Sequence, residues 1–281
     1  MVIPGQSMNA KVKIPDMPLP DWPVIGFIVS VHLLALSAFA PMTFSWPAVG
    51  VALFLHWLTV GVGVTLGYHR LITHRAFQVP KWVEYTLLFC ATLSCQSPIE
   101  WVGKHRMHHR YSDTPDDPHD INKGFWWTHV GWICHKLPCD RLMDQYVKDI
   151  AQDRVYRFLD RTMLAWQALL AALLFVIGGW PFVVWGIFVR LVAGYHSTWF
   201  VNSATHRFGC QSHDTGDQST NCWWVALVSY GEGWHNNHHA FPRSARHGLR
   251  WWEADVTWWM VRGLGALGLA TKVILPPRRA R

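Results

Sequence analysis

Four long apolar runs divide this chain and limit what it can fold into. A helix needs about 20 mostly apolar residues to cross the hydrocarbon core of a bilayer, and such a helix pairs its own backbone polar groups. The runs come close to that length and occupy residues 24–41, 48–68, 163–177 and 182–201. The sequence therefore predicts an all-α integral membrane protein with four transmembrane helices.

Basic residues are distributed unevenly among the connections between these runs. The connections near 42–46 and 178–181 are short and carry no Lys or Arg, whereas residues 69–162 carry 13 of them. Cytoplasmic loops are the ones enriched in Lys and Arg. We therefore expect two hairpins whose open ends face the cytoplasm, and the same bias explains the net charge of +7. No basic stripe interleaved with stacking aromatics is found apart from the histidine motifs, so nucleic-acid binding is not expected.

The remaining segments have no spanning pattern. Residues 1–22 are Pro-rich and are expected to be a flexible N-terminal lead without a cleaved signal peptide. Residues 23–281 are then one domain. The apolar stretch 83–95 is too short to cross and is expected to lie at the interface. Residues 207–281 are expected to be cytoplasmic, with helices in the headgroup region marked by Trp251, Trp252, Trp258 and Trp259.

Two further features are judged from their positions. Arg190 falls inside the fourth run, where a charge is costly, and is expected either to pair with an acid or to reach the interface. The six cysteines show no CxxC spacing, so we interpret them as thiols in a reducing compartment, not as a disulfide framework or a zinc site.

Histidine is concentrated just beyond the apolar runs. Three histidines fall within residues 235–239, and the same spacing recurs within 105–109. Residues i, i+3 and i+4 share one face of a helix, and imidazole is a common metal ligand. A pair follows the second run and a single histidine follows the fourth. We expect nine histidines to converge at the cytoplasmic membrane surface: His69, His74, His105, His108, His109, His206, His235, His238 and His239.

Nine imidazoles exceed the needs of one metal ion. Zinc takes four ligands at structural sites, so nine histidines predict two ions with four or five ligands each and a position left for water or dioxygen. Imidazole suits Fe, Zn, Cu and Ni alike, and the ligands alone do not choose among them. His32 and His56 are expected to be satisfied core residues. The other histidines are not expected to be ligands: His129, His135, His196, His213 and His247.

These motifs resemble those of a known family. HRLITH (69–74), HRMHH (105–109), NSATH (202–206) and HNNHH (235–239) look like the histidine motifs of the membrane-bound fatty acyl desaturases of the Δ9, stearoyl-CoA type. GYHRLITHRAF (67–77), DDPHDINKGFWW (116–127) and GEGWHNNHHAFP (231–242) are similar as well. The C-terminal part is similar to the bacterial and plant-plastid branch, and the resemblance covers roughly residues 23–275.

The resemblance implies a non-haem centre of two iron ions held within a cytoplasmic helical cap. One iron would be held by His69, His74, His105, His109 and His238. The other would be held by His108, His206, His235 and His239, with Asn202 acting through a water molecule. Candidates to orient the imidazoles by hydrogen bonding are Asp116, His119 and Glu232. With dioxygen as co-substrate, such a centre removes hydrogen from two adjacent methylenes and leaves a cis double bond.

The resemblance also implies a fatty acyl substrate and an external electron donor. Trp101, Thr198 and Trp199 would line the bend of an apolar acyl tunnel. The Arg-Asp pair that contacts CoA in the animal enzymes is replaced here by Gly103-Lys104, so both acyl-CoA and a glycerolipid-bound acyl chain stay open. No haem-binding HPGG motif occurs, and a separate ferredoxin or cytochrome b5-like protein is the expected donor.

Two other functions compete with this one. A membrane di-iron lipid hydroxylase shares such histidine motifs but inserts oxygen. A metal transporter or sensor would place its ligands inside the spans, whereas here they follow the ends of the runs.

Overall fold

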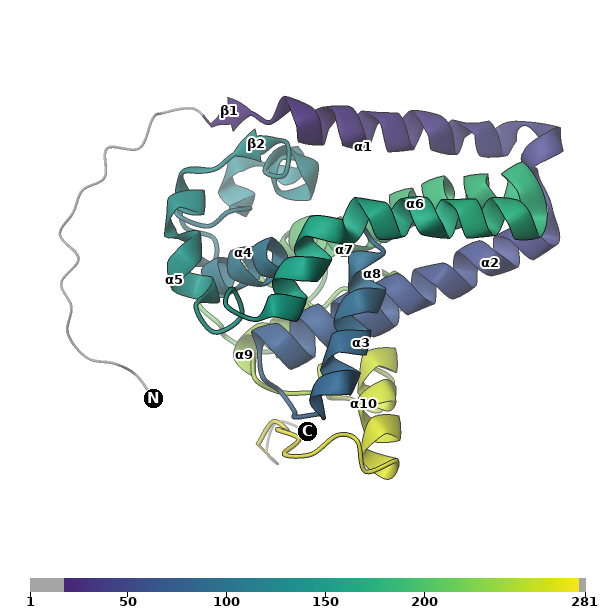
Figure 1. Ribbon diagram of the computed structural model, residues 1–281. Helices are drawn as coiled ribbons and strands as arrows, with labels where there is room; N and C mark the ends of the chain where they lie inside the picture. The colour runs from purple at the N-terminus through teal and green to yellow at the C-terminus, as the bar shows by residue number, and fades with distance from the viewer. Residues whose placement is uncertain (1–17, 278–281) are drawn as a thin grey trace.

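The computed structural model describes residues 18–277, and these residues are mostly helical (Figure 1). The α-helices are α1 (Trp22–Ala35), α2 (Trp46–His56), α3 (Lys81–Thr92), α4 (Pro98–Tyr111), α5 (Met143–Val147), α6 (Arg154–Val183), α7 (Arg190–Ser203), α8 (Trp223–Val228), α9 (His235–Ala240) and α10 (Val256–Ala266). The π-helical stretches are η3 (Trp57–Thr73), η5 (Trp127–Gly131) and η7 (Val184–Val189). The 3₁₀ turns are η1 (Leu36–Phe39), η2 (Pro41–Thr43), η4 (Ile121–Lys123), η6 (Pro138–Leu142) and η8 (Ala204–His206).

Three helical stretches within residues 18–277 are long and apolar enough to cross a membrane. They are Trp22–Phe39, Trp46–Thr73 and Arg154–His206. The third is interrupted at Gly179, whose φ of 64° and ψ of −157° are not helical. Large apolar side chains stay uncovered on these stretches, and Val176 on α6 is 82% exposed. Lipid is the medium that such surfaces fit, so a mostly helical membrane protein is confirmed.

The helices begin where the sequence supplies caps. Ser45 accepts a hydrogen bond from the backbone N–H of Ala48 at the start of α2, and Pro47 occupies the first turn. Ser97 does the same for Glu100 at the start of α4, again with a proline next to it. A side-chain oxygen at this position satisfies a backbone donor that has no partner within the helix, and proline fits the first turn.

The core lies around η3, which is buried along most of its length and packs against α3, α4 and α10. A β-carbon on Gly63 would stand only 2.4 Å from the backbone nitrogen of Ala91 on α3. Glycine therefore allows the two backbones to come into direct contact. A second apolar cluster joins α1, α2, α6, η7 and α7.

Two expectations need correction. The lead was expected to be flexible to residue 22, but Leu19–Pro20 form strand β1 and pair antiparallel with β2 (His135–Lys136); residues 1–17 lie outside the described part of the chain. Arg190 neither pairs with a carboxylate of the described residues nor reaches the interface. It is buried and donates to the carbonyl oxygen of Leu93 at 2.7 Å and to Gln167 Oε1 at 3.3 Å. Neutral oxygens from α6 and from the end of α3 thus satisfy its guanidinium.

Figure 1 shows where the histidine-bearing helices lie. Helices α1, α2 and α6 extend together toward one end of the molecule. Helices α4, α5 and α9 gather at the other end, where η3 also finishes. The candidate site therefore lies at the end opposite the tips of the long helices.

Candidate metal centre

His69 and His74 share one side of η3 because this stretch is π-helical. Five residues advance an α-helix by about 140° beyond a full turn, which would point the two rings apart. Here the backbone N–H of His74 donates to the carbonyl of His69 at 3.2 Å, the i to i+5 bond of a π-helix. The ring centroids lie 4.8 Å apart. Local unwinding thus turns an unfavourable spacing into a paired ligand set.

The two histidine triplets lie on short helices and divide between two groups of nitrogen atoms. On α4, His105 and His109 face one group and His108 faces the other. On α9, His238 faces the first group, while His235 and His239 face the second. His206, on η8 after α7, completes the second group. Helices α4 and α9 therefore contribute to both groups.

The first group is a set of five Nε2 atoms. His238 Nε2 lies 3.1 Å from that of His69 and 2.9 Å from that of His109. His105 Nε2 lies 3.1 Å from the Nε2 atoms of His74 and His109. The five atoms all fall within 4.8 Å of one another. The first group consists of His69, His74, His105, His109 and His238.

The second group is a set of four imidazoles and lies directly beside the first. His235 Nε2 is 3.1 Å from His206 Nε2, and His108 Nε2 is 3.3 Å from His239 Nε2. The rings of His109 and His239, one from each group, have centroids 4.6 Å apart. The second group consists of His108, His206, His235 and His239.

Carboxylates fix the proton on the far nitrogen of four of these rings. In the second group, Nδ1 of His108 faces Asp117 at 2.9 Å, that of His206 faces Asp113 at 3.0 Å, and that of His239 faces Asp217 at 2.6 Å. In the first group, His69 Nδ1 faces Glu232 at 2.7 Å. A carboxylate only accepts, so each Nδ1 carries the hydrogen and each Nε2 presents a bare lone pair.

Converging lone pairs repel one another unless a cation lies between them. Carboxylate–imidazole pairs of this kind are the usual support of metal-binding histidines. Both groups offer the four or five nitrogen ligands that an octahedral ion needs while leaving a coordination position open. The arrangement therefore fits two metal ions on the chemistry of its donor atoms alone.

Burial favours the neutral form of several of these rings. It lowers the pKa of His108, His235 and His238 well below the usual histidine value, and the neighbouring imidazoles lower it further. Burial alone would raise the pKa of Asp217, but the hydrogen bonds from His239, Ser219 and Thr215 and the charge of His239 together outweigh it, and the pKa is held well below its usual range. At Asp117 burial prevails and raises the pKa. Neutral imidazole is the form that binds metal.

Glu232 joins the first group to a buried ionic cluster. Its Oε2 lies 2.7 Å from Nδ1 of His69 and 3.0 Å from Nδ1 of His247. Its Oε1 accepts from Arg70 Nε at 3.0 Å, and Arg70 also contacts Asp255 at 2.9 Å. All five side chains are buried. The cluster therefore anchors the His69 ring to the segment that follows α9.

The other residues implied by the resemblance lie at varied distances from the groups. The ring of Trp101 stacks on that of His105 with centroids 5.1 Å apart, and the ring centroids of His119 and His108 lie 4.1 Å apart. Asn202 is half-buried on α7, one turn before His206, and makes no side-chain hydrogen bond within the described part of the chain. Thr198 donates to backbone carbonyls of its own helix. Trp199 packs against His32, His129 and His196.

The carboxylates were only partly anticipated. Asp116 is exposed, and its neighbour Asp117 is the residue that contacts His108. Asp113 and Asp217 lie in loops and were not identified from the sequence. His247 was set aside, yet it contacts Glu232 and its ring lies 4.4 Å from His238. For such residues the sequence offers one signal, which is proximity to a histidine motif. That signal does not show which carboxylate will point toward a histidine ring.

Comparison with known proteins agrees with this geometry. The family model described as fatty acid desaturase matches residues 44–271. The chain is 57% identical to the sn-1 stearoyl-lipid 9-desaturase of Synechocystis sp., over 93% of this chain and 82% of that protein. It is 57% identical to the protein of the same name from Anabaena variabilis, over 93% and 97%. It is 48% identical to the icosanoyl-CoA 5-desaturase of Limnanthes douglasii, over 87% and 70%.

Proposed function

The chain belongs to the fatty acid desaturase family and is a fatty acyl desaturase, and we propose that it converts a saturated acyl chain of a membrane glycerolipid into a cis-Δ9 monoene. The observation that carries this proposal is the pair of nitrogen groups, in which nine imidazoles bring their ring nitrogens together at two points. The relatives with 57% identity are named for a stearoyl-lipid substrate and for position 9.

We propose that the two groups hold two iron ions, with His69, His74, His105, His109 and His238 on one and His108, His206, His235 and His239 on the other. When bound, such a centre supplies the oxidising power to remove hydrogen from unactivated methylenes with dioxygen as co-substrate. Nitrogen-rich ligand sets suit iron but also other metals, so the metal is assigned from the family. Asn202 is proposed to act through a water molecule.

The protein itself would position the imidazoles and exclude water from the centre. Asp113, Asp117, Asp217 and Glu232 keep their imidazole partners in one tautomer and orientation. Trp101 lies over His105 and gives that side of the first group an apolar wall. Such a wall suits an acyl chain that must approach the centre without water. Thr198 and Trp199 are proposed to continue the acyl tunnel, and His119 to support His108.

A lipid-bound acyl chain is favoured over acyl-CoA. Lys104 replaces the aspartate of the CoA-binding pair and contacts Glu100 one helical turn away, so it does not offer a free cation. Some relatives are named for acyl-CoA substrates, which makes the carrier the first point to test.

The membrane arrangement is proposed from charge and from the Gly179 break. Four spans in two hairpins would leave residues 69–162 and 207–281 as a cytoplasmic cap that contains both groups. Residues 1–22 would be a lead to this single domain. Electrons would come from a separate ferredoxin or cytochrome b5-like protein.

The test is expression in a host that lacks its own membrane desaturase, followed by gas chromatography of total lipid. New cis-Δ9 monoenes should appear, and they should be absent with H235A, which should also contain less iron. Hydroxylated chains in their place would show a hydroxylase and refute the proposal. The carrier is tested with a short pulse of labelled stearate. Labelled monoenes that appear in the glycerolipid pool before they appear in the acyl-CoA pool would support the lipid-bound substrate, and the reverse order would refute it.

A further inference from the structure

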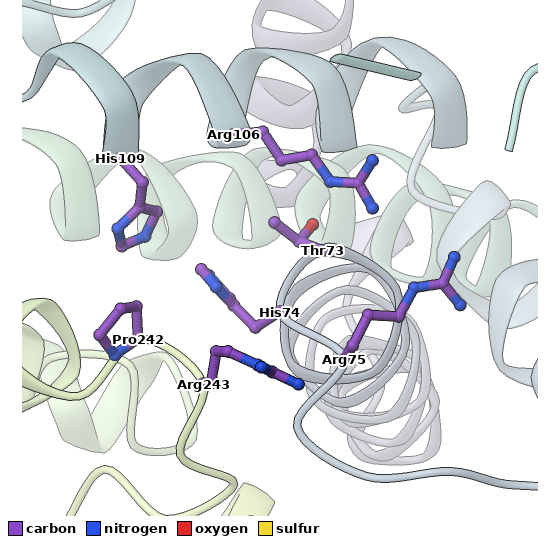
Figure 2. Close-up of a pocket in the computed structure, with 7 residues that line it drawn as sticks. All are labelled: Thr73, His74, Arg75, Arg106, His109, Pro242 and Arg243. Carbon is purple, nitrogen blue, oxygen red and sulfur yellow. The ribbon is translucent and has the colours of Figure 1, made fainter. Parts of the chain in front are cut away.

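A basic pocket opens directly onto the first group of histidines. The end of η3, the side of α4 and the segment after α9 form it, and His74 and His109 are among the residues that line it (Figure 2). Their ring centroids are 4.6 Å apart. Figure 2 shows these rings turned toward one another, with Arg75, Arg106 and Arg243 around them. The pocket therefore connects solvent to two of the proposed iron ligands.

The rim of this pocket is positive. Asp149 contacts two of the three guanidiniums, at 2.8 Å from Arg75 and 2.6 Å from Arg106. Its single negative charge offsets one of the three positive charges. Arg243 is exposed and makes no ion pair within residues 18–277. Three positive charges and one negative charge leave a net charge of +2 at the opening.

The chemistry of the reaction limits what this charge is for. An acyl chain is apolar and dioxygen is uncharged, so neither gains from three arginines. The remaining reactants are two protons and two electrons. Protons are positively charged and gain nothing from arginines, whereas the electrons must be delivered by a protein close to the metal centre. Redox partners form small and short-lived interfaces, and complementary charge supplies their orientation and association rate.

We propose that Arg75, Arg106 and Arg243 form the docking surface for an acidic one-electron carrier protein, and that His74 and His109 lie on the path by which its electrons would reach the proposed metal centre. This inference rests on the proposed function, because it needs a redox centre at the first group. The carrier's acidic side chains would contact the arginines, and its redox group would face the two imidazoles. Each carrier would deliver one electron, so two carriers would be needed for each double bond that is formed.

The experiment uses the enzyme in phospholipid nanodiscs with two reductants of opposite charge. One is a reduced plant-type [2Fe–2S] ferredoxin, which is acidic, and the other is the methyl viologen radical cation. The test variant is R243E, since Arg243 makes no side-chain hydrogen bond or ion pair with the residues that the structure describes. The matched control is R157E on α6, which reverses an exposed arginine away from the pocket. Binding of oxidised ferredoxin is measured separately by surface plasmon resonance.

R243E is expected to lower the ratio of ferredoxin-driven to viologen-driven turnover at least about tenfold at low salt and to weaken ferredoxin binding similarly. The difference should shrink at high salt because small ions screen the contact. R157E should leave both quantities unchanged. Equal ratios for R243E and R157E would overturn the docking surface. Weaker binding of R243E to anionic vesicles, with unchanged ferredoxin kinetics, would assign the arginines to the membrane and also overturn it.

Failure of the proposed function gives a different result. In that case wild-type enzyme makes no monoene with either reductant. The binding measurement needs no turnover, so it supports or overturns the docking surface in the same samples.

Discussion

Replacing Glu232 with glutamine should remove support from one metal ion and leave the other in place. Glu232 is 4% exposed and accepts a hydrogen bond from the guanidinium of Arg70, and its carboxylate lies 2.7 Å from Nδ1 of His69 and 3.0 Å from Nδ1 of His247. Glutamine has the same shape but only one acceptor oxygen. Whichever way its amide is turned, its NH₂ group faces the imidazole donors or Arg70, so at least one buried donor loses its partner.

The magnitude follows from burial and from the partners that remain. Breaking a buried charge pair costs about 3–5 kcal/mol, and Arg70 keeps Asp255 at 2.9 Å, so we expect the lower end of that range. Loss of a carboxylate behind a metal-binding histidine typically lowers affinity about 10- to 100-fold. The second group has its own carboxylates, so its occupancy should change little.

The assay is iron stoichiometry against a graded series of a competing chelator, with thermal unfolding of the same samples. E232Q should lose about one of the two proposed ions at chelator levels that wild type resists, and its Tm should fall. The control E100Q makes the same change in an exposed pair with Lys104, which is worth at most about 1 kcal/mol. Wild-type iron retention in E232Q would refute the role of Glu232.

Three further predictions address the second group, the packing of η3 and acid sensitivity. D217N removes the partner of His239 Nδ1 and should selectively lower occupancy of the second ion, measured with the same chelator series; loss of both ions together would contradict it. G63A places a β-carbon 2.4 Å from the Ala91 nitrogen and should cost about 1–3 kcal/mol in thermal unfolding, whereas G50A, which meets nothing within 4 Å, should be neutral. Burial, aided by Arg70, lowers the pKa of His247 to about 4. Since an unfolded histidine titrates near 6.5, the unfolded chain binds the extra proton between these values. His247 alone should therefore cost metal-free protein roughly 1.4 kcal/mol per pH unit as pH falls from about 6.5 toward 4, and the other buried histidines with lowered pKa add to this loss. Urea midpoints that hold steady or rise across that range would contradict it.

Local patterns in the sequence were sufficient for the long helices and for the convergence of the histidines. The thickness of the bilayer sets the length of the apolar runs. Histidines at i, i+3 and i+4 point to the same side as soon as their segment forms a short helix. The pairing of His69 with His74 had no such basis, because a spacing of five is unfavourable on an α-helix. It depends on the π-helical winding of η3, which no periodicity in residues 57–73 reveals.

The carboxylates show why supporting residues are harder to predict than ligands. Asp116 and Asp117 are adjacent, and the turn after α4 exposes the first and buries the second. Asp217 is 22 positions from His239, and only the folding of the loop before α8 brings them together. Arg190 illustrates the same limit, because its acceptors include a backbone carbonyl that no side-chain pattern records. Tertiary contact decides each of these cases, and the local sequence leaves several outcomes open.

Charge balance gives these supporting residues a common purpose. Neutral imidazoles cannot offset two ferrous ions, so the proposed centre would place four positive charges in a buried site beside the membrane, and an uncompensated buried charge is very costly. Four buried or partly buried carboxylates contact the imidazoles, and a fifth, Asp255, contacts the buried cation Arg70, which gives a net charge of −4 if all are ionised; the four are Asp113, Asp117, Asp217 and Glu232. This charge of −4 cancels the charge of +4 that the two proposed ions would carry. The carboxylates that orient the imidazoles would therefore also neutralise the proposed ions without coordinating them, and this would leave a coordination position beside the imidazoles open for dioxygen.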